Sequence, residues 1–246
     1  MAAPTSDWLR ARWDRLVASL GANSAEARRA FDDLAARYSH RDRHYHNLNH
    51  LRHVLETIDR LAPLAHNLRA VLLAAWFHDA VYDARAADNE ERSAALAREV
   101  LDQLGVPKPL GERVAELILL TKTHSAGSED IDGQILLDAD LAILGAPAER
   151  YLVYAAAIRR EYAWVPDSAY RPGRGAVLRR FLERPAIYRT PPIQEALEAA
   201  ARLNLEAEHD SLIRGAPLPA THAVGGTECR SESGKEGDEH GPKTRT

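Results

Sequence analysis

Two groups of histidine and aspartate residues lie beside apolar stretches of this 246-residue chain, and both residue types are common metal ligands. In the histidine-rich segment HRDRHYHNLNH, His46 and His50 are four residues apart and would share one face of a helix. His78 and Asp79 follow an apolar run that begins at Val71. A buried carboxylate must be hydrogen-bonded, ion-paired, neutralised or bound to a metal, because leaving it unpaired costs too much desolvation. A shared cation is therefore one hypothesis for these groups.

A third group lies in the segment LLDADLAILG, where Asp138 and Asp140 interrupt apolar sequence. Taken singly, a buried aspartate is more often a helix cap or an arginine partner, and a histidine cluster is more often a solvated face. Three such groups in one small chain favour a metal site. Histidine nitrogens and carboxylate oxygens without a thiolate suit Mn, Fe, Co, Ni or Mg. Such a site keeps open positions for water and substrate, as hydrolysis requires.

The elements that must position these groups are predicted to be helices. Apolar residues recur at helical spacing, and no alternating strand pattern competes with them. Ala, Leu, Arg and Glu dominate the composition, which favours helix over sheet. The segments predicted to be helical are residues 7–20, 23–38, one ending near 63, 67–82, 88–104, 109–123, 131–144, 147–163, 175–184 and 191–213.

The pattern predicts one all-α domain over residues 1–214, followed by a tail over residues 215–246. The tail lacks periodic apolar residues and is rich in Gly, Ser, Thr and charge, so it is predicted to be disordered. The segment VPDSAYRPGRG, with two prolines and two glycines, is predicted to be a loop that faces the substrate.

Composition excludes several classes of protein. The net charge of −4 provides no overall basic field, so there is no strong nucleic-acid signature. The single cysteine, Cys229, rules out disulfides and cysteine-based metal sites within one chain. No window approaches 18 continuous apolar residues, and the first residues do not resemble a signal peptide. We therefore expect a cytoplasmic protein without a membrane span, and the sequence leaves a homodimer open.

The order of these residues resembles the HD superfamily of metal-dependent phosphohydrolases. Its signature is a histidine, a His-Asp doublet and a distal aspartate that together bind a divalent metal in an all-helical fold. Here NHLRHV resembles the first motif, WFHDAVYD the second and LDADLAIL the last. Further stretches, among them LTKTH, FLERPAIY and ARLNLEAEHD, resemble one branch of predicted HD-domain phosphohydrolases, and the resemblance spans residues 10–213. It implies a single HD-type helical domain that hydrolyses phosphoesters.

Carried over residue by residue, the resemblance implies four metal ligands: His50, His78, Asp79 and Asp140. His46 is an alternative to His50, which is preferred because an apolar Val54 follows four residues later. Asp138 would either support the ligands or replace Asp140. Asp140 is preferred, because the family places its ligand just before the helix continues.

Catalytic roles are assigned to residues beside the expected ligands. Asp79 would orient the attacking water while binding the metal. His124, which follows an apolar helix, is the first candidate for the proton donor to the leaving oxygen. Glu91 and Asp83 are alternatives for a general acid or a water-orienting carboxylate, although acids in DNEERSA also suit the start of a helix.

The expected substrate is a small phosphorylated molecule, with a nucleotide as the first choice. Arginine binds phosphate bidentately and aromatic rings can stack on a base. The residues expected to bind the substrate are Lys122, Arg159, Arg174 and Tyr170. Two other functions stay open: a non-catalytic module on the same fold that senses a nucleotide, and a helical scaffold whose tail binds a partner.

Overall fold

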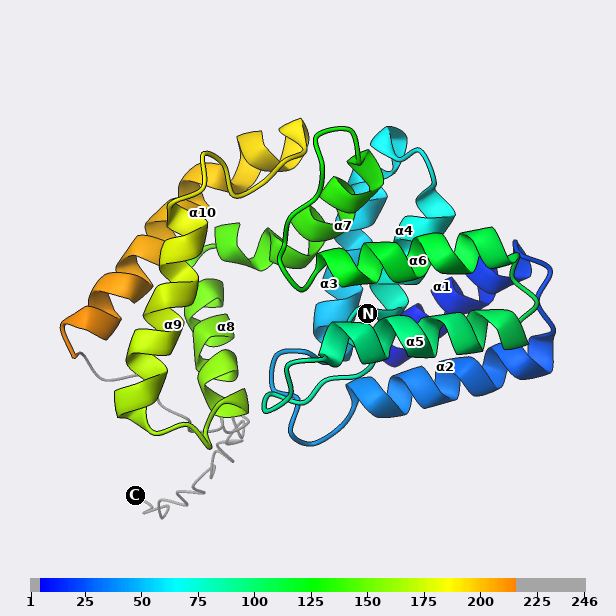
Figure 1. Ribbon diagram of the computed structural model, residues 1–246, viewed down its shortest axis with the longest axis horizontal. Helices are drawn as coiled ribbons and strands as arrows, with labels where there is room; N and C mark the ends of the chain where they lie inside the picture. The colour runs from blue at the N-terminus through cyan, green and yellow to red at the C-terminus, as the bar shows by residue number, and fades with distance from the viewer. Residues whose placement is uncertain (1–4, 216–246) are drawn as a thin grey trace, which may run out of the picture.

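The computed structural model describes residues 5–215, and within this range the regular structure is entirely helical (Figure 1). The predicted all-α fold is therefore confirmed. The tail is predicted to begin at residue 215, and the part of it that follows Gly215 lies outside the described residues. The helices are α1 (Thr5–Ala18), α2 (Ser24–Tyr38), α3 (Leu48–Leu61), η1 (Ala62–Leu64), α4 (Leu68–Phe77), α5 (Asn89–Gln103), α6 (Lys108–Leu120), α7 (Ile131–Leu141), η2 (Ala142–Gly145), α8 (Ala148–Glu161), α9 (Asp167–Leu182) and α10 (Pro191–Ile213).

Helix α4 is the centre of the N-terminal part of the fold. Seven of the ten residues in its sequence LRAVLLAAWF are buried, and it packs against α3, α5, α6 and α7. Trp76 on α4 meets Trp13 on α1 edge-to-face, with ring centroids 5.2 Å apart. This packing holds α4 in place, so the residues that follow it have a fixed position.

Helices α8, α9 and α10 form a second group, which Figure 1 shows to one side of α1–α7. Helix α10 packs on α9 and on η2. The contact with η2 is close because Gly145 has no side chain: an added Cβ would lie 2.6 Å from the Cβ of Leu197. Helix α7 and η2 therefore connect the two groups of helices.

The prediction that the segment VPDSAYRPGRG forms a loop is wrong, because residues 167–175 of this segment lie in α9. The helix begins at Asp167, directly after Pro166, and continues through Pro172. A proline inside a helix removes one hydrogen bond. The segment is helical despite that lost hydrogen bond, with Tyr170 and Leu178 buried and α9 packed against α10. The helix predicted over residues 67–82 also ends early, at Phe77, so that Asp79 lies in a turn.

Among the described residues, no single helix is long and apolar enough to cross a membrane. One bent pair, Ile131–Gly145 with Ala148–Glu161, meets the length and composition test together, with its two parts at 106°.

Candidate metal centre

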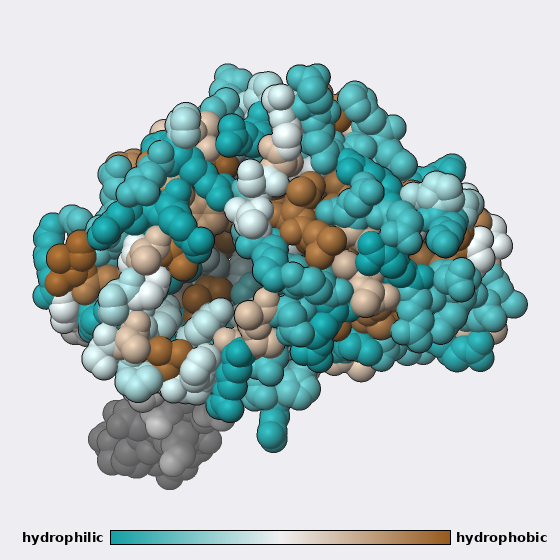
Figure 2. Space-filling model, viewed as in Figure 1, coloured by the Kyte–Doolittle hydropathy of each residue, from teal (hydrophilic) through white to brown (hydrophobic). Residues whose placement is uncertain are grey.

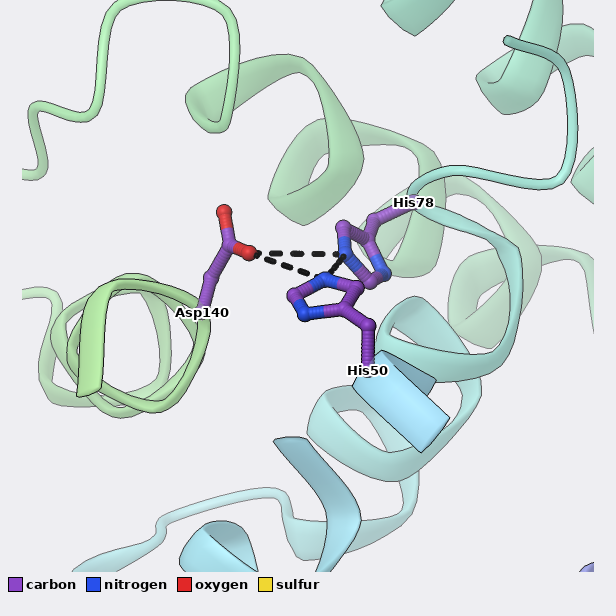
Figure 3. A group of neighbouring side chains, drawn as sticks. All are labelled: His50, His78 and Asp140. Atoms are coloured by element: carbon purple, nitrogen blue, oxygen red, sulfur yellow. Dashed lines mark hydrogen bonds and ion pairs between the residues drawn. The ribbon is translucent and has the colours of Figure 1, made fainter. Parts of the chain in front are cut away.

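Three side chains from different parts of the chain converge in the interior of the fold. His50 lies in the first turn of α3, His78 directly follows α4, and Asp140 lies in the last turn of α7. One ligand atom from each lies within 4.8 Å of the other two (Figure 3). The Nε2 atoms of the histidines are 3.2 Å apart, and Oδ1 of Asp140 lies 3.2 Å from that of His50 and 3.6 Å from that of His78.

Asp79 approaches the same two nitrogens. Its Oδ2 lies 3.1 Å from Nε2 of His78 and 3.4 Å from Nε2 of His50. With metal–ligand bonds of about 2.1 Å, neighbouring ligand atoms lie about 3.0 Å apart at right angles and about 3.4 Å apart at the tetrahedral angle. Each carboxylate is therefore spaced from the two histidine nitrogens as a neighbouring ligand of one ion would be, but the group whose ligand atoms all lie within 4.8 Å of one another consists of His50, His78 and Asp140 without Asp79.

Local structure positions the backbone of His50 and the ring of His78. Asn47 caps α3, and its side chain accepts hydrogen bonds from the backbone N–H groups of Asn49 and His50. Nδ1 of His78 lies 2.9 Å from the carbonyl oxygen of Ala75. A carbonyl oxygen can only accept, so Nδ1 carries a proton, and Nε2 is the nitrogen that faces the other converging side chains. His78 is therefore preset as a ligand through Nε2.

The electrostatic environment keeps the carboxylates of Asp79 and Asp140 ionised where these side chains converge. Burial raises the pKa of the Asp79 carboxyl, but the neighbouring His78 and His46 hold it well below its usual value. Burial likewise opposes ionisation of Asp140, and hydrogen bonds from His124, His50 and His78 keep its pKa well below the usual value. Two ionised carboxylates beside two buried imidazoles require a cation, which is either a proton or a metal ion.

Arg43 fixes the turn that carries Asp79. Its guanidinium donates to the carbonyl oxygens of Asp79 at 2.6 Å, His46 at 3.1 Å and Ala80 at 3.0 Å. These bonds connect the histidine-rich segment to the turn after α4. The sequence did not single out Arg43, because nothing in a polar segment distinguishes an arginine that makes structural contacts from one that is exposed to solvent.

His46 lies beside the converging donors and is held by a carboxylate. Its Nδ1 is 2.7 Å from Oε2 of Glu161, a side chain with no exposed surface. Glu161 also accepts from the N–H groups of Tyr45 and His46 and from the hydroxyl of Tyr82. Burial raises the pKa of Glu161, but His46 and these hydrogen bonds outweigh it and lower the pKa to about 2. Glu161, at the end of α8, was not found from the sequence.

Asp138 is separated from the histidines and has another role. Its carboxylate accepts hydrogen bonds from the backbone N–H groups of Arg189 and Thr190 and from the hydroxyl of Thr190. Thr190 is the N-cap residue directly before α10, so Asp138 fixes the start of that helix. The alternative in which Asp138 replaces Asp140 as a ligand is not the arrangement observed.

His124 contacts the other oxygen of Asp140, with Nε2 3.1 Å from Oδ2. Its backbone φ is +48°, a conformation that non-glycine residues adopt at some cost. Arg184 holds this strained turn by donating to the carbonyl oxygens of His124 at 2.7 Å and Thr123 at 3.0 Å. The predicted proton donor is therefore close to the converging residues.

Three other predicted residues lie on the surface and are engaged elsewhere. Glu91 is exposed and pairs with Lys122, which also donates to the carbonyl oxygen of Ala87 at 3.0 Å. Asp83 is exposed and accepts from the N–H of Arg85, an interaction typical of a turn. The structure does not bring Glu91, Asp83 or Lys122 together with the histidines.

A cavity of about 460 Å³ opens beside Asp140 and extends along α8 and α9. Figure 2 shows the hollow between the α8–α10 group and the rest of the molecule, with hydrophobic surface inside it. The predicted substrate residues Arg174 and Tyr170 line the cavity. Arg159 does not: it binds the carbonyl oxygens of Tyr162 and Val165 and the carboxylate of Asp167, so it fixes the connection between α8 and α9.

No protein-family model, no curated protein and no solved structure matches this chain. The resemblance to the HD superfamily therefore depends on the motifs and on their placement in an all-helical fold.

Proposed function

We propose that this chain is a divalent-metal-dependent phosphohydrolase that acts on a small phosphorylated molecule. One observation carries the proposal: His50, His78 and Asp140 converge from α3, the end of α4 and α7, with Asp79 beside the same two nitrogens, and Asp140 also lines a cavity of about 460 Å³. The order of these residues in the chain is that of the HD signature, which supports the phosphohydrolase class over other metal-dependent activities.

The side chains divide the chemistry between them. His50, His78, Asp140 and Asp79 would hold the ion, which supplies a water of lowered pKa and polarises a phosphoryl oxygen. Asp79, whose side chain is 19% exposed, would orient the attacking water. His124, which borders the cavity, would protonate the leaving oxygen. Glu161 would fix the imidazole of His46 at the cavity wall.

A non-catalytic sensor of a phosphorylated ligand is the second candidate. The observation that favours it over catalysis is the pairing of Arg174: this guanidinium contacts both oxygens of Glu208, at 2.9 Å and 3.0 Å, and so is not free to stabilise charge that develops on a phosphoryl group during hydrolysis. A sensor would bind metal and ligand without turnover.

The test is to purify the protein without added metal, measure its metal content, and screen phosphoesters for hydrolysis with Mn, Mg, Co and Ni. The expected result is a bound or activating divalent ion and a loss of kcat/KM of roughly 100-fold or more in His50→Ala and Asp79→Ala. His53→Ala is the matched control, because His53 is exposed on the same helix. Equal metal content and activity in wild type and Asp79→Ala would refute the proposal, whereas metal and ligand binding without any hydrolysis would favour the sensor.

A further inference from the structure

The cavity beside Asp140 is polar at one end and apolar along most of its length. Its polar end is formed by His46, His124 and Asp140. Most of the remaining lining side chains are aliphatic or aromatic, among them Tyr154, Ile158, Tyr170, Val177, Leu178 and Phe181. A ligand that fills the cavity must therefore present a charged group at one end and an apolar body at the other.

The charge inside the cavity is already balanced. Among the described residues that line it, Arg174 is the only arginine or lysine. Its Nε and Nη2 bind the two oxygens of Glu208, and Nη2 also donates to the hydroxyl of Tyr154 at 3.3 Å. The side chains of this pair are 10% and 12% exposed. Separating a buried ion pair leaves an uncompensated charge, so a second anionic group of a ligand would find no available partner.

We propose that the substrate is the phosphate monoester of a compact apolar or aromatic alcohol. Its phosphate lies at the end beside Asp140, and its organic group lies between α8 and α9. The inference rests on the proposed phosphohydrolase function. In the reaction, the oxygen of water forms a bond to phosphorus, the bond from phosphorus to the ester oxygen breaks, and that oxygen takes up a proton to leave as the alcohol.

Physical chemistry favours this class over the nucleotide expected from the sequence. Burial of a phenyl or alkyl group in an apolar cavity stabilises the complex in proportion to the area removed from water. A ribose or glycerol group would bury hydroxyls in a cavity whose lining is mostly apolar, which costs free energy unless each one is hydrogen-bonded. A triphosphate would add charge that Arg174 is not free to neutralise.

Gly173 offers a way to fill the cavity without disturbing the fold. It lines the cavity on α9, and a Cβ added there meets no atom within 4 Å. Leucine at this position would occupy the space of the organic group. Ala176 is an exposed residue on the same helix and lies outside the cavity lining, so Ala176→Leu adds the same side chain elsewhere.

The first experiment compares esters of primary alcohols, so that leaving-group reactivity is matched. Benzyl phosphate and butyl phosphate are set against glycerol 1-phosphate, ribose 5-phosphate and AMP, using the metal-loaded full chain. The expected kcat/KM for benzyl phosphate exceeds that for glycerol 1-phosphate by roughly 10-fold or more, mainly through KM. Equal or better turnover of AMP or glycerol 1-phosphate would overturn the proposed substrate class while leaving the phosphohydrolase intact.

The second experiment uses the variants and a ligand that cannot be hydrolysed. Gly173→Leu is expected to reduce the preference for benzyl phosphate by about 10-fold, whereas Ala176→Leu keeps the wild-type preference. An unchanged preference in Gly173→Leu would contradict the assigned location. Binding of benzylphosphonate, measured by calorimetry, separates the two proposals: binding without hydrolysis of any ester overturns the phosphohydrolase and supports the ligand class, and absence of both overturns both.

Discussion

Asp138 and Asp140 lie two residues apart on α7 and have different environments. Asp138 is buried against the start of α10 and accepts hydrogen bonds only from neutral donors at Arg189 and Thr190. Burial raises its pKa. Asp140 faces three histidines, which lower its pKa. The same residue type therefore stabilises a helix start at one position and contributes a candidate ligand at the other.

Alanine at each of these positions should separate the two roles. Asp138→Ala leaves buried backbone N–H groups without an acceptor, so we expect the free energy of unfolding to fall by about 2–3 kcal/mol. The folded fraction should retain its metal. Asp140→Ala should lose metal instead. Urea unfolding in the presence of a chelator and elemental analysis of the folded protein measure the two effects. Loss of metal from folded Asp138→Ala would contradict the assignment.

Glu161 should make stability depend on pH in the acid range. Its pKa is lowered from 4.5 to about 2 in the folded protein. Its ionised form therefore contributes stability that is present above pH 4.5, as long as His46 beside it is protonated, and that is lost as the pH falls toward 2. The shift corresponds to a contribution on the order of 3 kcal/mol.

The measurement compares urea unfolding of wild type and Glu161→Gln between pH 7 and pH 2.5. We expect the stability difference to be largest above pH 4.5 and to shrink as the pH falls toward 2. Glu56→Gln, which removes a partly exposed partner of Arg52, is the control and should show little change at any pH. A difference between wild type and Glu161→Gln that stays constant across the range would argue against the assigned role of Glu161.

At the residue scale, the sequence predicted the converging side chains better than it predicted the residues that hold them in place. His78 and Asp79 were conspicuous because they end an apolar run, and adjacency alone placed them together. Glu161 and Arg43 reach the same region from α8 and from the segment before α3. Their contacts depend on tertiary packing across many residues, which a local pattern of charge does not encode.

At the scale of elements, α9 shows where local rules are overridden. Proline and glycine in RPGRG are typical of a turn, and the sequence predicted one. The structure continues the helix through Pro172, with Tyr170 and Leu178 buried and α10 packed alongside. Long segments with regular apolar spacing, such as α2 and α10, were predicted well because their pattern and their burial agree.

Replacement of Pro172 should therefore stabilise the protein. Pro172→Ala restores a helical hydrogen bond and removes a steric clash within α9, and we expect the free energy of unfolding to rise by about 1–3 kcal/mol. Pro191→Ala is the matched control: Pro191 is the first residue of α10, where proline fits, so no gain is expected. Urea denaturation of both variants provides the comparison. A loss of stability in Pro172→Ala would show that the proline is required where it stands.

At the scale of the whole molecule, the candidate centre connects parts that fold from distant sequence. His50, His78 and Asp140 come from α3, the end of α4 and α7, and Asp140 also borders the cavity beside α8 and α9. Metal binding would therefore hold together α3, the end of α4 and α7, and it should affect the stability of the domain.

A ligand that binds only the folded state stabilises it by mass action, by about 2.7 kcal/mol at 100 times its dissociation constant. A divalent ion at that concentration should accordingly raise Tm by about 5–10 °C in a chain of this size, and a chelator should reverse the rise. In His50→Ala the ion should have no such effect, because one of the converging donors is missing. His53→Ala should respond as wild type does, because His53 is exposed beside Arg150. Differential scanning calorimetry with and without metal measures all three proteins, and an equal metal-dependent rise in His50→Ala would locate the ion elsewhere in the molecule.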